Sequence, residues 1–193
     1  MAARAGMTTL IQKVRSYTNA GTADYTLAGT AYWSDDQLED TLDSHRRKVL
    51  KVSLDPEQNF VNSDYQTTIY HLPEWANNLE QFASDSEFRL YDSTGTNIGT
   101  ADYSVNYEAR AITFTTDQDS AVRYADFHIY DVFRAASEVW KQKAAHVAAN
   151  VNWQSDNHRI DAAQEYEHCL KMATQYAGMA GPTFTRMVRV DEA

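Results

Sequence analysis

The hydrophobic pattern of this 193-residue chain changes its period twice, and this change limits the possible folds more than any other feature. Apolar residues recur at helical spacing over residues 8–18, 34–52, 129–147 and 162–177. Between the second and third of these segments, residues 60–127 are rich in β-branched and aromatic residues and alternate as strands do. The pattern therefore predicts helices at both ends of the chain and a β-rich middle.

The segment 34–52 carries the clearest local signals for a helix. Ser34 is a favourable N-cap, and Gln37, three residues later, completes a capping box. Acidic residues crowd the first half of the segment and basic residues crowd the second half, which suits the helix dipole. One apolar stripe runs along the segment, formed by Leu38, Leu42, His45 and Val49. We therefore expect one continuous helix here.

Two long helices joined by a short loop are expected to pack antiparallel. We predict an α+β fold in which helices from both chain ends form an antiparallel bundle. A small antiparallel β subdomain is inserted in this bundle, and an extended C-terminal tail follows it. The predicted boundaries are 1–55 for the N-terminal helices, 56–124 for the insertion, 125–181 for the helices that complete the bundle, and 182–193 for the tail.

The net charge of −10 is concentrated in the predicted insertion. Residues 56–124 contain three basic and eleven acidic residues, a net charge of −8, which supports a separate segment. An acidic chain argues against a protein whose main task is to grip nucleic-acid phosphates. The single cysteine, Cys169, excludes an intrachain disulfide. No apolar run approaches the roughly 20 residues that cross a bilayer, and the N-terminus lacks the apolar region of a secretory signal.

Candidate catalytic groups in the sequence are few. Glu165 and His168 have the Glu-x-x-His spacing of di-iron helical bundles, but the second pair that such a site needs is missing. Cys169 points about 100° away from His168 on a helix, so the two do not form a nucleophile–base pair. We therefore predict no enzyme, no metal and no cofactor. Two alternatives stay open: a metal-dependent helical enzyme built on Glu165 and His168, and a carbohydrate-binding module that uses Trp75 or Tyr103.

Three stretches carry a resemblance to a known family. They are Trp33-Ser34-Asp35-Asp36-Gln37-Leu38-Glu39-Asp40-Thr41-Leu42-Asp43, Tyr130-Asp131-Val132-x-x-Ala135-Ala136-Ser137-Glu138-Val139-Trp140-Lys141-Gln142-Lys143-Ala144-Ala145, and His168-Cys169-Leu170-x-Met172-Ala173-x-x-Tyr176-Ala177. Their order and spacing resemble the head–tail connector adaptor (head completion) proteins of tailed bacteriophages. The resemblance implies a structural virion protein at the head–tail junction, made in the host cytoplasm. About a dozen copies would form a ring that joins the portal to the tail or stopper and extends the DNA exit channel.

The resemblance also implies partners and contact residues. The partners are other copies of the chain, the portal protein and a stopper or tail-completion protein, with DNA only as passing cargo and no membrane. The C-terminal segment would dock on the portal through Phe184, Met187 and Val188 as anchors, with Arg186 and Arg189 as polar clamps. An alternative within the same class is another neck or tail-completion component.

A ring interface needs two different complementary faces on each copy. We predict that the acidic start of the 34–52 helix meets the basic end of the same helix in a neighbouring copy. The residues assigned to this contact are Asp35, Asp36, Arg46 and Arg47.

Overall fold

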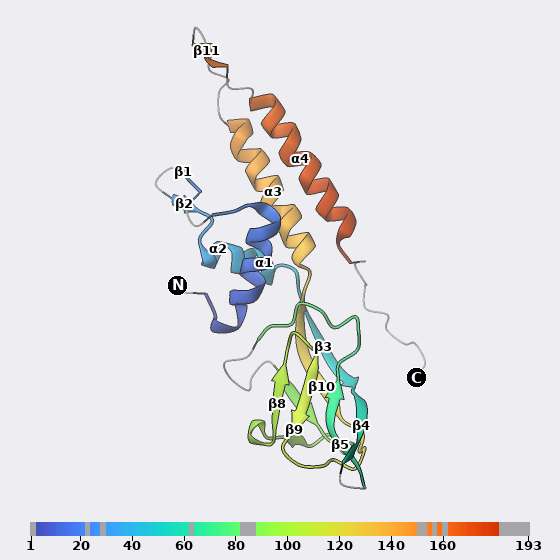
Figure 1. The fold of residues 1–193 in the computed structure, drawn as a ribbon. Helices are drawn as coiled ribbons and strands as arrows, with labels where there is room; N and C mark the ends of the chain where they lie inside the picture. The colour runs from blue at the N-terminus through green and yellow to red at the C-terminus, as the bar shows by residue number, and fades with distance from the viewer. Residues whose placement is uncertain are drawn as a thin grey trace, which may run out of the picture. The chain divides into compact units, whose positions relative to one another are not determined.

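The chain folds as two compact units, Met1–Tyr130 and Asp131–Ala193 (Figure 1). The computed structural model describes residues 3–21, 24–27, 30–61, 64–81, 88–149, 154–155, 158–159 and 162–181. Within these ranges, no helix has both the length and the apolar composition that crossing a membrane requires.

The N-terminal unit begins with short helices and a small hairpin. The elements are η1 (Ala5–Met7), α1 (Thr8–Thr18), β1 (Tyr25–Leu27), β2 (Thr30–Tyr32) and α2 (Asp35–Asp43). The helix predicted over residues 8–18 is confirmed as α1. The predicted capping box is also confirmed: the Ser34 hydroxyl accepts from the Gln37 N–H, and the Gln37 side chain accepts from the Ser34 N–H, at 3.3 and 3.0 Å. The cap explains why α2 begins where it does.

Two four-stranded antiparallel sheets make up the rest of the described N-terminal unit. The first sheet has the order β3 (Arg46–Ser53), β10 (Tyr124–Tyr130), β6 (Arg89–Tyr91), β7 (Asn97–Ile98). The second has the order β4 (Asp55–Val61), β5 (Asp64–His71), β9 (Ala111–Phe114), β8 (Tyr103–Asn106), and η2 (Thr100–Asp102) precedes β8. One buried apolar cluster joins the two sheets, with Tyr70, Ile112 and Phe114 from the second and Leu90 and Phe127 from the first.

The C-terminal unit is a helical hairpin of α3 (Val132–Ala149) and α4 (Ala162–Met179), with the short strands β11 (Gln154–Ser155) and β12 (His158–Arg159). Both long helices are confirmed predictions. They pack through Trp140 and Ala144 on α3 and Cys169 and Ala173 on α4. The buried Ser137 hydroxyl donates to the Ala173 carbonyl at 2.8 Å. Trp140 fills this seam beside the small side chains of Ala144, Cys169 and Ala173.

The predicted helical bundle from both chain ends is wrong. Strands dominate the N-terminal half of the chain, and the two long helices stand at its C-terminal end. The helices α1 and α2 are only 11 and 9 residues long, and they belong to the same compact unit as the sheets. The correct class is α+β with two antiparallel four-stranded sheets in the described residues.

The single helix predicted over residues 34–52 is also wrong. The helix α2 ends at Asp43, and the basic stretch that follows it is strand β3. Within β3, Val49 and Val52 lie opposite Phe127 and Ala125 of β10. This pairing gives the β3 backbone its hydrogen bonds and packs its valines against the core. The stripe that joined Leu42 to Val49 at helical spacing was therefore fortuitous.

Candidate functional site

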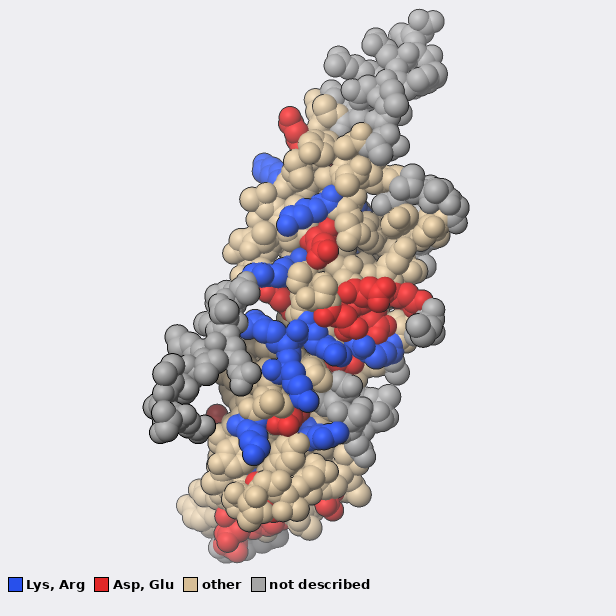
Figure 2. All heavy atoms as spheres, turned by 180° about the vertical axis from the view of Figure 1, so that it is seen from behind, with Lys and Arg blue, Asp and Glu red and all other residues tan. Residues whose placement is uncertain are grey.

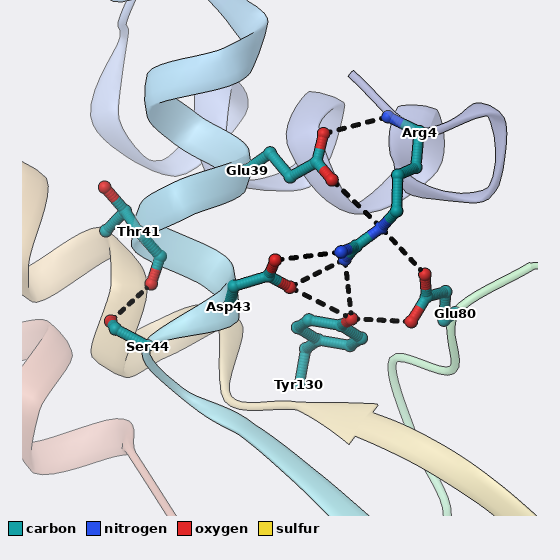
Figure 3. A network of polar contacts seen from close by, with 7 residues as sticks. All are labelled: Arg4, Glu39, Thr41, Asp43, Ser44, Glu80 and Tyr130. Carbon is teal, nitrogen blue, oxygen red and sulfur yellow. Dashed lines mark hydrogen bonds and ion pairs between the residues drawn. The ribbon is translucent and has the colours of Figure 1, made fainter. Parts of the chain in front are cut away.

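Five side chains from four segments of the N-terminal unit meet in one polar network (Figure 3). Arg4 precedes η1, Glu39 and Asp43 lie on α2, Glu80 lies in the segment that follows β5, and Tyr130 is the last residue of β10. Four of these side chains converge on the guanidinium of Arg4.

Arg4 contacts three carboxylates at once. Its Nε lies 2.9 Å from Glu39 Oε1 and 3.1 Å from Glu80 Oε1. Its two terminal nitrogens donate to the two oxygens of Asp43 at 2.9 and 2.7 Å, which is the paired geometry that makes arginine–carboxylate contacts strong. The Arg4 backbone N–H also donates to Glu39 Oε2 at 2.9 Å. The network therefore fixes the N-terminal segment to α2 by both main chain and side chain.

The Tyr130 hydroxyl is the neutral member of the network. It donates to Glu80 Oε2 at 2.6 Å and accepts from Arg4 Nη2 at 3.2 Å. Burial raises the pKa of Tyr130 well above its usual value, and the hydrogen bond to Glu80 raises it further. The hydroxyl therefore keeps its proton at physiological pH and supplies a donor to a carboxylate that is only 5% exposed.

The surrounding carboxylates stabilise the charged forms of two arginines, Arg4 and Arg46. The hydrogen bond to Asp43 raises the pKa of Arg4, and this effect outweighs the opposing effect of burial. Burial lowers the pKa of Arg46, but its hydrogen bond with Tyr130 and the charges of Asp43 and Glu80 reverse the sign of the net shift. The two arginines thus stay charged beside three carboxylates. The network holds the N-terminal segment, α2, the segment after β5 and the end of β10 together. Its five side chains include no activated nucleophile.

Sequence reasoning missed this network. Its contacts join residues 35 to 126 positions apart, such as Arg4 with Glu39 and Arg4 with Tyr130. Only α2 carries a local signal, because Glu39 and Asp43 belong to the acidic residues that suit the start of a helix dipole. No pattern in the sequence connected them with Glu80.

The residues predicted to form contacts between subunits lie on two elements. Asp35 and Asp36 are in the first turn of α2, and Arg46 and Arg47 are exposed at the start of β3. Asp35 already accepts an ion pair within the chain, from Arg15 at 2.6 Å. The predicted contact between an acidic face and a basic face stays a prediction, now with the acidic face on a helix and the basic face on a strand.

The predicted portal-docking residues lie outside the described residues. These are Phe184, Arg186, Met187, Val188 and Arg189. Their role stays a prediction.

The residues of the metal-enzyme alternative lie exposed on α4. The ring of His168 meets Trp140 edge-on at 5.8 Å, and Glu165 points to solvent. Within the described ranges, no three His, Cys, Asp or Glu side chains are grouped as metal ligands. Cys169 is buried, and burial raises the pKa of its thiol, so the weakly nucleophilic protonated form prevails at neutral pH.

A hollow of about 350 Å³ lies on the N-terminal unit. It is lined by Lys51, Tyr91, Ser93, Thr94, Gly95 and Tyr124. Asp126 supports it, because this carboxylate accepts from the Lys51 N–H at 2.6 Å and from the Tyr91 hydroxyl at 3.1 Å. None of the six lining residues is a histidine or a carboxylate, so the lining offers its hydroxyl groups no general base.

Two exposed apolar surfaces stand out, one in each unit. On α4, Ala163, Tyr166, Leu170 and Ala177 share one side of the helix beside the seam with α3, and all are exposed. We call this group the α4 stripe. On the β4–β5 hairpin, Phe60 and Tyr65 lie opposite one another with ring centroids 5.1 Å apart, 66% and 68% exposed. We call this pair the hairpin aromatics.

Together these features define an α+β protein with a structural polar network and two exposed apolar surfaces. Comparison of the chain with protein-family models, with curated protein sequences and with solved structures gives no match.

Proposed function

We propose that this chain is a structural virion protein of a tailed bacteriophage. It forms a ring at the head–tail junction and joins the portal to the tail or stopper. One observation carries the proposal: each unit exposes an apolar surface, and the two surfaces are unlike. A connector needs this property, because it binds different proteins on its two sides.

The α4 stripe has the form of a helix-docking surface. Tyr166 and Leu170 are one turn apart, and Ala177 continues the stripe two turns after Leu170. Leu170 is 39% exposed although it borders the buried seam around Cys169. An apolar helix face of this kind fits a complementary groove or another helix on a partner.

The hairpin aromatics have the form of an interface anchor. Large aromatic side chains contribute much of the binding energy in protein interfaces when a partner covers them. Phe60 and Tyr65 contact each other edge to face, so the pair presents one preformed apolar knob.

The sequence resemblance supports the placement in a phage neck. Its three stretches lie mainly on α2, on α3 and on α4. The helices do not form the bundle that was expected, but the three stretches are helical over most of their length.

Complementation of a phage that lacks the gene tests the proposal. Loss of the chain should leave DNA-filled heads without tails, and the wild-type gene should restore tailed particles. Leu170→Glu should fail to restore them because it places a charge in the α4 stripe. The matched control is Gln175→Glu, an exposed position on the polar side of the same helix. Normal tailed particles without the gene would refute the proposal.

A further inference from the structure

Strand β3 is an edge of the first sheet. It pairs with β10 on one side, and in the described part of the chain no strand pairs with its other side. An open edge presents N–H and C=O groups that are ready to contact another chain. The chemistry of the side chains on β3 therefore indicates what the edge contacts.

The edge is basic, and it has an apolar side chain in its middle. Within Arg46–Ser53 there are four basic residues and no acidic one. Leu50 is 59% exposed between Lys48 and Lys51. The ammonium groups of these two lysines have no ion-pair partner among the described residues. In Figure 2, Lys and Arg side chains gather on the face that is shown.

Charged side chains on an edge strand also protect against aggregation. Protection explains the lysines of β3, but it does not explain an exposed leucine among them. An exposed leucine with a lysine on either side along the strand suits a binding surface for an acidic protein partner, because interfaces combine an apolar centre with a polar rim. Duplex DNA fits this edge less well, since it would meet a chain of net charge −10 and would leave Leu50 unused.

The complementary surface is present in the same chain. The helix α2 carries five carboxylates and no basic residue. Arg15 pairs with Asp35, and Arg4 pairs with Glu39 and Asp43, so α2 keeps an excess of negative charge. Asp40 is exposed on this helix and has no cationic partner among the described residues.

We infer that the edge of β3 binds a second copy of this chain, and that the acidic α2 of that copy covers it. Each copy then offers a basic strand to one neighbour and an acidic helix to the other. This contact is heterologous, and such contacts build a ring when the rotation between copies closes. The inference rests on the proposed function, since it names the surfaces through which the ring assembles.

Charge reversal on the full chain tests the inference. One variant is Lys48→Glu with Lys51→Glu, and the other is Asp36→Lys with Asp40→Lys. The mass of the assemblies is measured by analytical ultracentrifugation at low and high salt, with circular dichroism as a check on folding. Wild type should assemble at low salt and dissociate as salt rises, because the contact is between exposed charges. Each variant alone should assemble about tenfold or more weakly, because like charges then face each other.

An equimolar mixture of the two variants should regain assembly, since every contact in an alternating ring then joins opposite charges. The matched control is Lys141→Glu with Lys171→Glu, which makes the same charge change at exposed positions of α3 and α4 and should assemble as wild type does.

Variants that assemble as wild type does would overturn the inference while leaving the ring in place. A wild-type chain that stays monomeric at low salt and at all concentrations would also overturn the inference. The phage complementation tests the proposed function independently of this result. Loss of binding to duplex DNA in the β3 variant, with unchanged self-association, would assign the edge to nucleic acid and overturn the inference as well.

Discussion

Replacing Arg4 by methionine tests whether the polar network holds the N-terminal unit together. Methionine keeps much of the length of the side chain but removes the guanidinium that contacts Glu39, Asp43 and Glu80. The three carboxylates then face one another without their central cation. We expect the variant to fold and the free energy of unfolding of the N-terminal unit to fall.

The size of the effect follows from burial. Removing one partner of a fully buried ion pair costs about 3–5 kcal/mol, whereas an exposed pair is worth about 0–1 kcal/mol. Glu39 and Glu80 are buried, but the Arg4 side chain is 42% exposed, so water screens its contacts. Arg46 also remains nearby and compensates part of the lost charge. We therefore expect a loss of about 2 kcal/mol, or a fall in Tm of about 4–8 °C.

Urea titration and calorimetry of the transition of the N-terminal unit measure this loss. Arg4→Lys should lose less, because it keeps the charge and gives up the paired contact with Asp43. Lys13→Met is the matched control: it removes an exposed cation whose described contact is with Asn78, and it should change stability by less than about 0.5 kcal/mol. A loss for Arg4→Met as small as that of the control would show that the network does not hold the N-terminal unit together.

Three further predictions concern packing, thiol chemistry and the tail. Gly6→Ala should lower the free energy of unfolding in urea titration by about 1–3 kcal/mol, because its Cβ would lie 1.6 Å from the Gln81 carbonyl oxygen. Gly178→Ala, with open space on α4, should raise that free energy by up to about 1 kcal/mol. Equal effects of the two substitutions would contradict this expectation. Cys169 should react with Ellman's reagent far more slowly in the native chain than in urea, and equal rates would show that the thiol is accessible. Deletion of residues 182–193 should leave a folded chain that no longer joins portal rings in a pull-down, and unchanged binding would contradict the docking role.

Elements whose causes are local were predictable from the sequence. The Ser34–Gln37 capping box lies within four residues, and it marked the start of α2 correctly. The long helices α3 and α4 repeat apolar residues over several turns, and the β8–β9 hairpin joins two alternating strands by a short turn. In each case the signal that predicts the element lies in residues that are close in the sequence.

Strand β3 was not predictable because its cause is distant. Its partner β10 begins at Tyr124, far along the chain, and only that pairing makes the stretch after α2 a strand. The order of charges in residues 35–51, acidic first and basic second, also suits the dipole of one long helix. Charge order therefore does not distinguish that helix from a helix followed by a strand. The pairing of Val49 with Phe127 of β10 makes this stretch a strand, and the local order of charges does not indicate that pairing.

The network around Arg4 escaped for the same reason. Arg4 and Tyr130 are 126 positions apart, and an isolated arginine near the N-terminus carries no signal of a buried partner. The carboxylates of α2 were read as helix-stabilising charges, whereas Glu39 and Asp43 also hold the N-terminal segment in place.

Cryo-electron microscopy of the neck in purified phage particles tests whether this chain is a connector protein. We expect a closed ring of copies of this chain between the portal and the tail or stopper, with the edge of β3 in one copy against α2 of the next. Particles whose neck contains no density for the chain would contradict it.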